Sequence, residues 1–333
     1  MKRTAKISKY LNIAFNMCIL IISVLYILNA FENKKLDFTE LFDTISNFSP
    51  SLIWLVLSVL LIFMLLNWTL ETMKWKLLVS PIYQISFISA FKSVLLGVFT
   101  GLFMPNRTGE WIGRIFSVPN AQKGALFVHT MIGNMAQLLV TLIMGTVAIF
   151  YFSDLRTLLL EQFSKINKIL GLQISWWLIL VILFSILVIF LVLFLNKKTK
   201  SIKRSFIHLK NIPLKSYFNI FGISALRYGV FTIQYLILFY AFTINIPLLD
   251  LFLLISLYFM ILAIIPSVVF TEVGIRGSVS LFIFGLYGSL NHMDASLMNT
   301  KVIFVMLIVW LINIILPAVA GSIFLYRLKV FGK

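Results

Sequence analysis

Residues 86–116 read SFISAFKSVLLGVFTGLFMPNRTGEWIGRIF, an apolar run that stops at Pro105 and gives way to charged residues. Basic residues stand at both ends of the run, with Lys92 near its start and Arg107 and Arg114 after it. Because basic residues concentrate on the cytoplasmic side of a membrane, both ends are predicted to lie on that side. A run that enters and leaves on one face is a re-entrant hairpin, so we predict that 86–116 dips into the bilayer and returns.

The composition of the whole chain is that of a membrane protein. Of its 333 residues, 61% are hydrophobic and 12% are charged, and the mean hydropathy is +1.03. A soluble domain is about half apolar and a quarter charged. The formal net charge of +17 would suggest nucleic acid as a partner of a soluble protein. Here the basic residues lie between apolar runs, so the predicted partner is an anionic leaflet and not nucleic acid.

Apolar runs that could cross a bilayer as helices recur along the chain. They lie near 11–30, 51–70, 86–104, 125–151, 174–195, 217–242 and 249–265, with further runs near 277–290 and 301–325. We predict one all-α membrane domain over 1–333, a polytopic bundle with about eight crossings. The basic loop 196–216 and both termini are predicted to be cytoplasmic. The short run 277–290 is interpreted as half of a broken helix within 249–290.

The first apolar run resembles a signal peptide, because Lys2 and Arg3 precede it. We interpret it as a retained span, because Leu11–Leu28 is long enough to cross and Leu28 stands where cleavage needs a small residue. The single cysteine, Cys18, lies inside this run and excludes an internal disulfide framework.

Two polar segments interrupt the apolar background. Residues 105–114 read PNRTGEWIGR, and residues 266–277 read PSVVFTEVGIRG. Each holds a glutamate followed four residues later by an arginine, a spacing that places both on one helical face. Each pair could simply neutralise itself, but paired breaks in two halves are how many transporters build a substrate site, often within inverted repeats. The predicted break residues are Pro105, Gly109, Pro266, Gly274 and Gly277.

Other polar residues follow helical spacing inside the spans. Thr130, Asn134, Gln137 and Thr141 share a face of 125–151, and for Asn134 and Gln137 we favour hydrogen bonding between helices. Arg227 lies deep inside 217–242, as does Gln234. This arginine must snorkel, pair with Glu110 or Glu272, or bind an anion.

Motifs typical of soluble enzymes are absent from the sequence. His129, His208 and His292 lie in separate segments, without the spacing of metal ligands. The dinucleotide, Walker and nucleophile-elbow patterns are missing as well. We therefore expect no catalytic residue, no metal and no cofactor.

In these segments the sequence resembles the flippase-like membrane domain family, also called the lysylphosphatidylglycerol synthase transmembrane region. The family's first signature is Pro-x-Arg-x-Gly-Glu-x-x-Arg. It is matched, with one extra residue before the final arginine, by Pro105, Arg107, Gly109, Glu110 and Arg114.

The family's second signature, a proline followed by Gly-x-Gly-x-Arg-Glu, is matched at Gly274 and Arg276. Glu272 replaces one of its glycines, and Gly277 replaces its glutamate. The resemblance implies a bundle in the bacterial inner membrane that binds or moves a phospholipid or a polyprenyl-phosphate lipid; a homo-oligomer is compatible with it. The larger synthases make an aminoacyl lipid in a soluble carboxy-terminal domain. Because this chain stops at Lys333, we expect it not to carry that reaction.

Two functional hypotheses follow. The first is a flippase for an anionic or phosphate-bearing lipid, and the alternative is a membrane glycosyltransferase acting on a polyprenyl-phosphate sugar, with Glu110 or Glu272 as general base. Because a charge facing lipid costs about 3 kcal/mol, both polar segments should meet at one basic cavity in the cytoplasmic half of the membrane. The expected head-group ligands are Arg107, Glu110, Arg114, Arg227, Glu272 and Arg276.

Overall fold

The structure is a computed structural model that describes residues 38–104, 107–118, 122–170, 213–265, 267, 269–293 and 295–325. Every regular element within these residues is helical, which confirms the all-α class. The predicted spans 11–30 and 174–195, most of the loop 196–216, Pro105 and Pro266 lie outside the described residues. The helices are α2 (Phe38–Ser46), α3 (Pro50–Val79), α4 (Phe87–Gly101), α5 (Gly109–Phe116), α6 (Lys123–Tyr151), α7 (Ser153–Leu170), α10 (Leu214–Ala241), α11 (Leu248–Ile264), α12 (Val269–Leu290), α13 (Ala295–Trp310), the π-helix η2 (Leu311–Ile315) and α14 (Leu316–Ser322).

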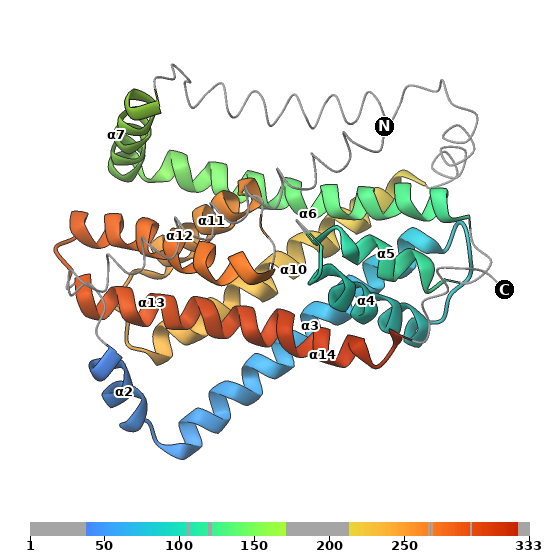
Figure 1. The fold of residues 1–333 in the computed structure, drawn as a ribbon, viewed down its shortest axis with the longest axis horizontal. Coiled ribbons are helices and arrows are strands. Elements are labelled where there is room, and N and C mark those ends of the chain that lie inside the picture. The colour runs from blue at the N-terminus through green and yellow to red at the C-terminus, as the bar shows by residue number, and fades with distance from the viewer. Residues whose placement is uncertain are drawn as a thin grey trace, which may run out of the picture.

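Long helices form a layered bundle in which α6, α10, α3 and the continuous α13–η2–α14 rod run across the molecule (Figure 1). Five described segments are long and apolar enough to span a bilayer, and the apolar helices α4 and α11 are shorter. The five segments are Pro50–Val79, Lys123–Tyr151, Leu214–Ala241, Thr271–Leu290 and Met298–Ser322. The chain is therefore a multi-pass membrane protein.

Local sequence signals explain where several helices begin. Ser49 caps α3 by accepting a hydrogen bond from the Leu52 amide, and Pro50 occupies the first turn, where no amide is needed. Ser86 caps α4 in the same way, and Pro213 and Pro247 stand just before α10 and α11. These signals start the helices close to the predicted apolar runs.

The segment 86–116 folds as a hairpin of two short, tightly packed helices. Gly97 and Gly101 on α4 face Gly109 and Gly113 on α5, and a methyl group added to Gly109 would overlap the Thr100 carbonyl. The Thr100 hydroxyl donates to the Gly109 carbonyl at 2.7 Å. Small residues four apart on both helices allow this close approach. The placement of the hairpin as a re-entrant element stays a prediction, because it depends on where the membrane surface lies.

The second predicted break is shorter than expected. Helix α11 ends at Ile264, and α12 begins at Val269 and continues through Gly274 and Gly277. The predicted turn at these two glycines is therefore wrong, and 277–290 is no separate half-helix. Both glycines are buried, and Ser280 donates to the Gly277 carbonyl at 2.8 Å. A backbone away from water keeps its helical hydrogen bonds, so a buried glycine does not by itself end the helix.

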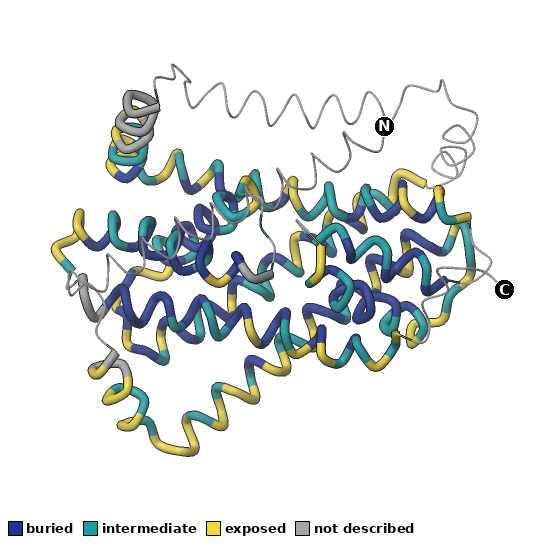
Figure 2. The backbone as a smooth tube through the Cα atoms, viewed as in Figure 1, coloured by how far each residue is buried: buried dark blue, intermediate teal, exposed yellow. Residues whose placement is uncertain are grey.

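Burial is concentrated along the inner faces of the bundle, whereas the outer faces of α3 and α2 are exposed (Figure 2). The largest apolar cluster surrounds α11, whose Leu254, Ile255 and Tyr258 are fully buried, and a second one joins α3 to the α4–α5 hairpin. Beside α7, Asp250 accepts hydrogen bonds from Tyr151 at 3.0 Å and Tyr287 at 2.7 Å, which ties α6 and α12 to α11.

Candidate functional site

A cavity of about 500 Å³ opens between the two halves of the chain. Its charged lining consists of Glu71, Lys74, Arg107, Glu110, Arg227, Glu272 and Arg276. The hairpin supplies Arg107 and Glu110, and α12 supplies Glu272 and Arg276, so both predicted polar segments face one space. This volume lies within the range of small-molecule and cofactor pockets.

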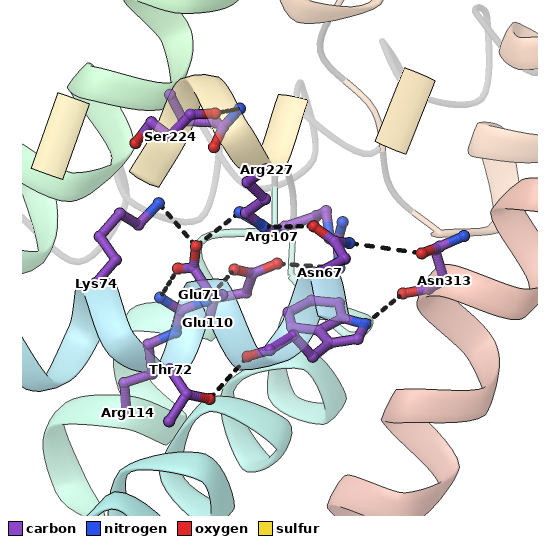
Figure 3. Close-up of polar contacts among 12 residues, drawn as sticks. Asn67, Glu71, Thr72, Lys74, Arg107, Glu110, Arg114, Ser224, Arg227 and Asn313 are labelled. Atoms are coloured by element: carbon purple, nitrogen blue, oxygen red, sulfur yellow. Dashed lines mark hydrogen bonds and ion pairs between the residues drawn. The ribbon is translucent and has the colours of Figure 1, made fainter. Parts of the chain in front are cut away.

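Glu71, on α3, is the centre of the charged network (Figure 3). Its carboxylate, 1% exposed, contacts Arg114 at 2.5 Å, Lys74 at 2.7 Å and Arg227 at 2.7 Å. The three cations come from α5, α3 and α10 respectively. A single buried carboxylate thus joins the hairpin to both long helices. Arg227 pairs with Glu71, whereas pairing with Glu110 or Glu272 was one of three alternatives left open by the sequence.

Glu110 connects the two arginines of the hairpin. It contacts Arg107 at 3.0 Å and Arg114 at 3.1 Å, the second being the predicted i,i+4 pair. Arg114 is 4% exposed, lies against Gly97 and is absent from the cavity lining. We therefore assign Arg114 a positioning role in place of the predicted head-group contact, because Glu71 and Glu110 hold its guanidinium behind the wall.

Arg107 combines strain with partial exposure. Its φ of 57° lies in the left-handed region, which costs a non-glycine residue about 1 kcal/mol or more. The side chain is 26% exposed, the highest among the ion-paired residues of the cavity. The Arg107 Nε is buried and has no hydrogen-bond partner. This strained residue presents an unused donor at the cavity.

The second segment contributes a looser ion pair. Arg276 Nε lies 3.8 Å from Glu272 Oε2, which is too far for a hydrogen bond. The same carboxylate oxygen accepts a hydrogen bond from the Trp310 indole at 2.6 Å. Like Arg107, Arg276 keeps a buried Nε without a hydrogen-bond partner.

Hydrogen bonds between side-chain amides connect the π-helix η2 to α3 and α10 beside the cavity. Asn313 exchanges hydrogen bonds with Gln234 at 2.7 and 3.2 Å, and its backbone carbonyl accepts from the Trp68 indole at 3.1 Å. Asn67 accepts from Arg227 Nε at 2.9 Å and donates to Asn313 at 3.5 Å. Single π turns often occur at functional sites. Here the π turn carries the asparagine that orients Arg227 through Asn67.

The remaining lining is neutral or apolar. Asn134, Gln137 and Thr141 of α6 face the cavity, and Gln137 also donates to the Ser224 carbonyl at 3.4 Å. The interpretation of Gln137 as an interhelical hydrogen-bonding residue is thus confirmed, although this residue lines the cavity as well. Apolar and aromatic lining comes from Trp68, Trp111, Leu138, Tyr228, Phe231, Phe259, Leu262, Ile265 and Ile314.

Sequence reasoning missed Glu71 and Lys74, which follow the predicted apolar run 51–70. In the structure, Lys74 is 2% exposed inside α3 and pairs with Glu71. A signal was present, because Asn67, Glu71 and Lys74 stand at i, i+4 and i+7 and so share one face of an extended helix. The described ranges hold no group of three metal-ligating side chains, so no metal site is assigned there.

The chain matches a known protein family. A family model described as the lysylphosphatidylglycerol synthase TM region matches residues 16–321, nearly the whole chain. The matched range includes both polar segments and the full lining of the cavity. No curated protein and no solved structure matches the chain.

Proposed function

The chain belongs to the lysylphosphatidylglycerol synthase TM region family, and on that premise we propose that it binds an anionic, phosphate-bearing lipid and moves its head group across the membrane. The proposed location is the bacterial cytoplasmic membrane, with both termini on the cytoplasmic side. The protein family supports a lipid as the partner. The basic lining of the cavity supports an anionic head group on that lipid.

The observation that carries the proposal is an excess of positive charge in and directly behind the cavity wall. Among the described residues, the carboxylates of the site are Glu71, Glu110 and Glu272. The basic side chains in and directly behind the wall are Lys74, Arg107, Arg114, Arg227 and Arg276. Unpaired charge is expensive inside a membrane, and charged residues there mark substrate pathways. A bound anion offsets the excess.

The mixed lining supports a lipid and not a free ion. Guanidinium groups suit phosphate because their planar fork can bond two of its oxygens. The apolar part of the lining, with Phe231, Phe259 and Leu262, suits the glycerol and upper chain region of a lipid. One cavity thus offers contacts for both parts of an amphipathic molecule.

The glycosyltransferase alternative needs a carboxylate that is free to act as general base. In the described part of the chain, Glu71 and Glu110 each contact at least two cations, and Glu272 accepts the Trp310 indole. These contacts favour ionised carboxylates engaged in holding cations. We therefore propose a transporter and not an enzyme; sugar transfer from a polyprenyl-phosphate donor by the purified protein would reverse that choice.

The test uses purified protein in phosphatidylcholine liposomes with a small share of head-group-labelled phosphatidylglycerol or polyprenyl phosphate. We expect the protein to bind the labelled lipid and to accelerate its exchange between leaflets. Arg107→Gln should weaken the binding and slow the exchange, because it removes a cavity-facing guanidinium. Arg156→Gln on α7 makes the same chemical change away from the cavity lining and should leave both unchanged. If the protein neither binds nor exchanges any lipid in the series, the proposal is refuted.

A further inference from the structure

The carboxylates of the cavity are committed to groups of the protein itself. Glu71 contacts three cations, and Glu110 contacts two. Glu272 accepts a hydrogen bond from the Trp310 indole and lies near Arg276. These contacts leave no carboxylate of the site to neutralise a further cation.

Among the described residues, the site holds five basic side chains and three carboxylates, so two positive charges have no counter-charge. Arg107 must share Glu110 with Arg114, and Arg276 lies 3.8 Å from Glu272. The Nε atoms of Arg107, Arg114 and Arg276 are buried without a hydrogen-bond partner, but Arg114 also contacts two carboxylates, at 2.5 and 3.1 Å. The least satisfied guanidinium groups therefore come one from each half of the chain, and both line the same cavity.

We propose that the cavity selects a lipid whose head group carries two negative charges on phosphate, a phosphomonoester or a diphosphate, over a phosphodiester lipid with one. This inference rests on the proposed function and names its substrate class. A dianion neutralises the excess charge fully, whereas a phosphodiester leaves one buried cation unmatched. Arg107 and Arg276, one from each half of the chain, bind the phosphate together.

The shape of the phosphate supports the same choice. A phosphomonoester offers three terminal oxygens and a charge of about −1.5 to −2 near neutral pH. A phosphodiester offers two such oxygens, because two of its four are esterified. Each guanidinium group can donate two hydrogen bonds to a pair of phosphate oxygens. Two such groups on different segments bind one phosphate more readily when it has three terminal oxygens than when it has two. The third oxygen lets Arg107 and Arg276 bind one phosphate together.

The experiment compares phosphatidic acid with phosphatidylmethanol, which differs by one methyl ester and one charge. Each lipid is offered to the full-length protein in phosphatidylcholine nanodiscs, and binding is measured by native mass spectrometry. We expect phosphatidic acid to bind at least about tenfold more tightly, the effect of one additional strong charge-assisted contact. Equal affinities would overturn the inference while leaving the proposed function intact. If the protein binds neither lipid and no other anionic lipid, both the inference and the proposed function are overturned.

Variants locate the selectivity. Arg276→Gln removes one excess positive charge. The affinity for phosphatidic acid should then exceed that for phosphatidylmethanol by no more than about threefold, which is less than the effect of one strong charge-assisted contact. Arg107→Gln should act alike, and its partly exposed side chain makes it the safer variant for folding. Arg156→Gln should keep the full preference. An unchanged preference in both cavity variants would overturn the inference.

A soluble competitor separates a lipid site from a phosphate site. Glycerol 3-phosphate carries the same phosphomonoester without acyl chains. We expect it to displace phosphatidic acid only weakly, because it lacks the part that contacts the apolar lining. Displacement at equal concentration would assign the cavity to a soluble phosphate and overturn the lipid inference.

Discussion

Replacing Glu71 with glutamine keeps the shape of the side chain but removes the carboxylate that Lys74 and Arg227 contact. In the described residues neither cation has another acidic partner. Arg114 would keep Glu110 at 3.1 Å. The variant therefore leaves the buried Lys74 and the partly exposed Arg227 close together without their counter-charge.

The magnitude follows from burial. Glu71 and Lys74 are 1% and 2% exposed, so solvent screens their charges little. Removing one partner of a buried ion pair costs about 3–5 kcal/mol, because the other charge remains buried and uncompensated. With several cations on one carboxylate, we expect the upper part of this range for Glu71→Gln.

The assay is reversible unfolding of the purified protein in mixed micelles by increasing denaturing detergent, followed by tryptophan fluorescence. Asp43→Asn is the matched control, since it makes the same carboxylate-to-amide change at an exposed position of α2. We expect that control to change the unfolding free energy by no more than about 0.5 kcal/mol. The variant Arg227→Gln completes a double-mutant cycle with Glu71→Gln.

Two results would contradict the reasoning. One is a Glu71→Gln variant that unfolds within about 1 kcal/mol of the control, because a buried pair cannot be broken so cheaply. The other is strict additivity in the cycle, since groups in one network should couple by about 0.5–3 kcal/mol. Either result would mean that the carboxylate does not hold Arg227 in solution.

Three further predictions concern packing and hydrogen bonds. Gly109→Ala should destabilise the protein by about 3 kcal/mol, because the methyl meets the Thr100 backbone, whereas Gly222→Ala, with nothing within 4 Å, should be neutral or gain up to about 1 kcal/mol; equal effects in the same unfolding assay would contradict this. Asn313→Leu should cost about 2–3 kcal/mol by leaving the Gln234 amide unpaired, and Gln234→Leu in the same background should then cost much less. Asp250→Asn should cost only about 1 kcal/mol, because the Tyr151–Asp250 hydrogen bond is exposed to solvent and an amide oxygen can still accept from Tyr287; a loss above about 3 kcal/mol would contradict this.

The helices were predictable where apolar character is continuous. The run predicted at 249–265 appears as α11, Leu248–Ile264, and the run at 125–151 as α6, Lys123–Tyr151. The end of α3 was missed because charged residues interrupt the run after residue 70, and a hydropathy window treats them as loop. Hydropathy counts residues along the chain, whereas burial depends on which face of the helix they occupy.

The site was predictable only in its local part. The Glu110–Arg114 pair follows from i,i+4 spacing on one helix. The partners of Glu71 do not, since Arg114 is 43 residues away and Arg227 is 156 residues away. Such contacts depend on how helices cross, which one sequence without its three-dimensional packing does not reveal. The contact of Arg114 with Glu71 was missed for this reason.

The position of Lys74, three residues after Glu71 on α3, matters for how the polypeptide first enters the bilayer. An isolated charged residue at the middle of an inserting helix costs about 2.5–3.5 kcal/mol. Because Lys74 is synthesised with Glu71, the nascent α3 carries its own counter-charge before the ribosome has made α5 or α10. Arg114 and Arg227 arrive later and replace that provisional neutrality with a network between helices. The order of the residues along the chain thus allows a carboxylate essential to the finished site to be delivered in a nearly neutral segment.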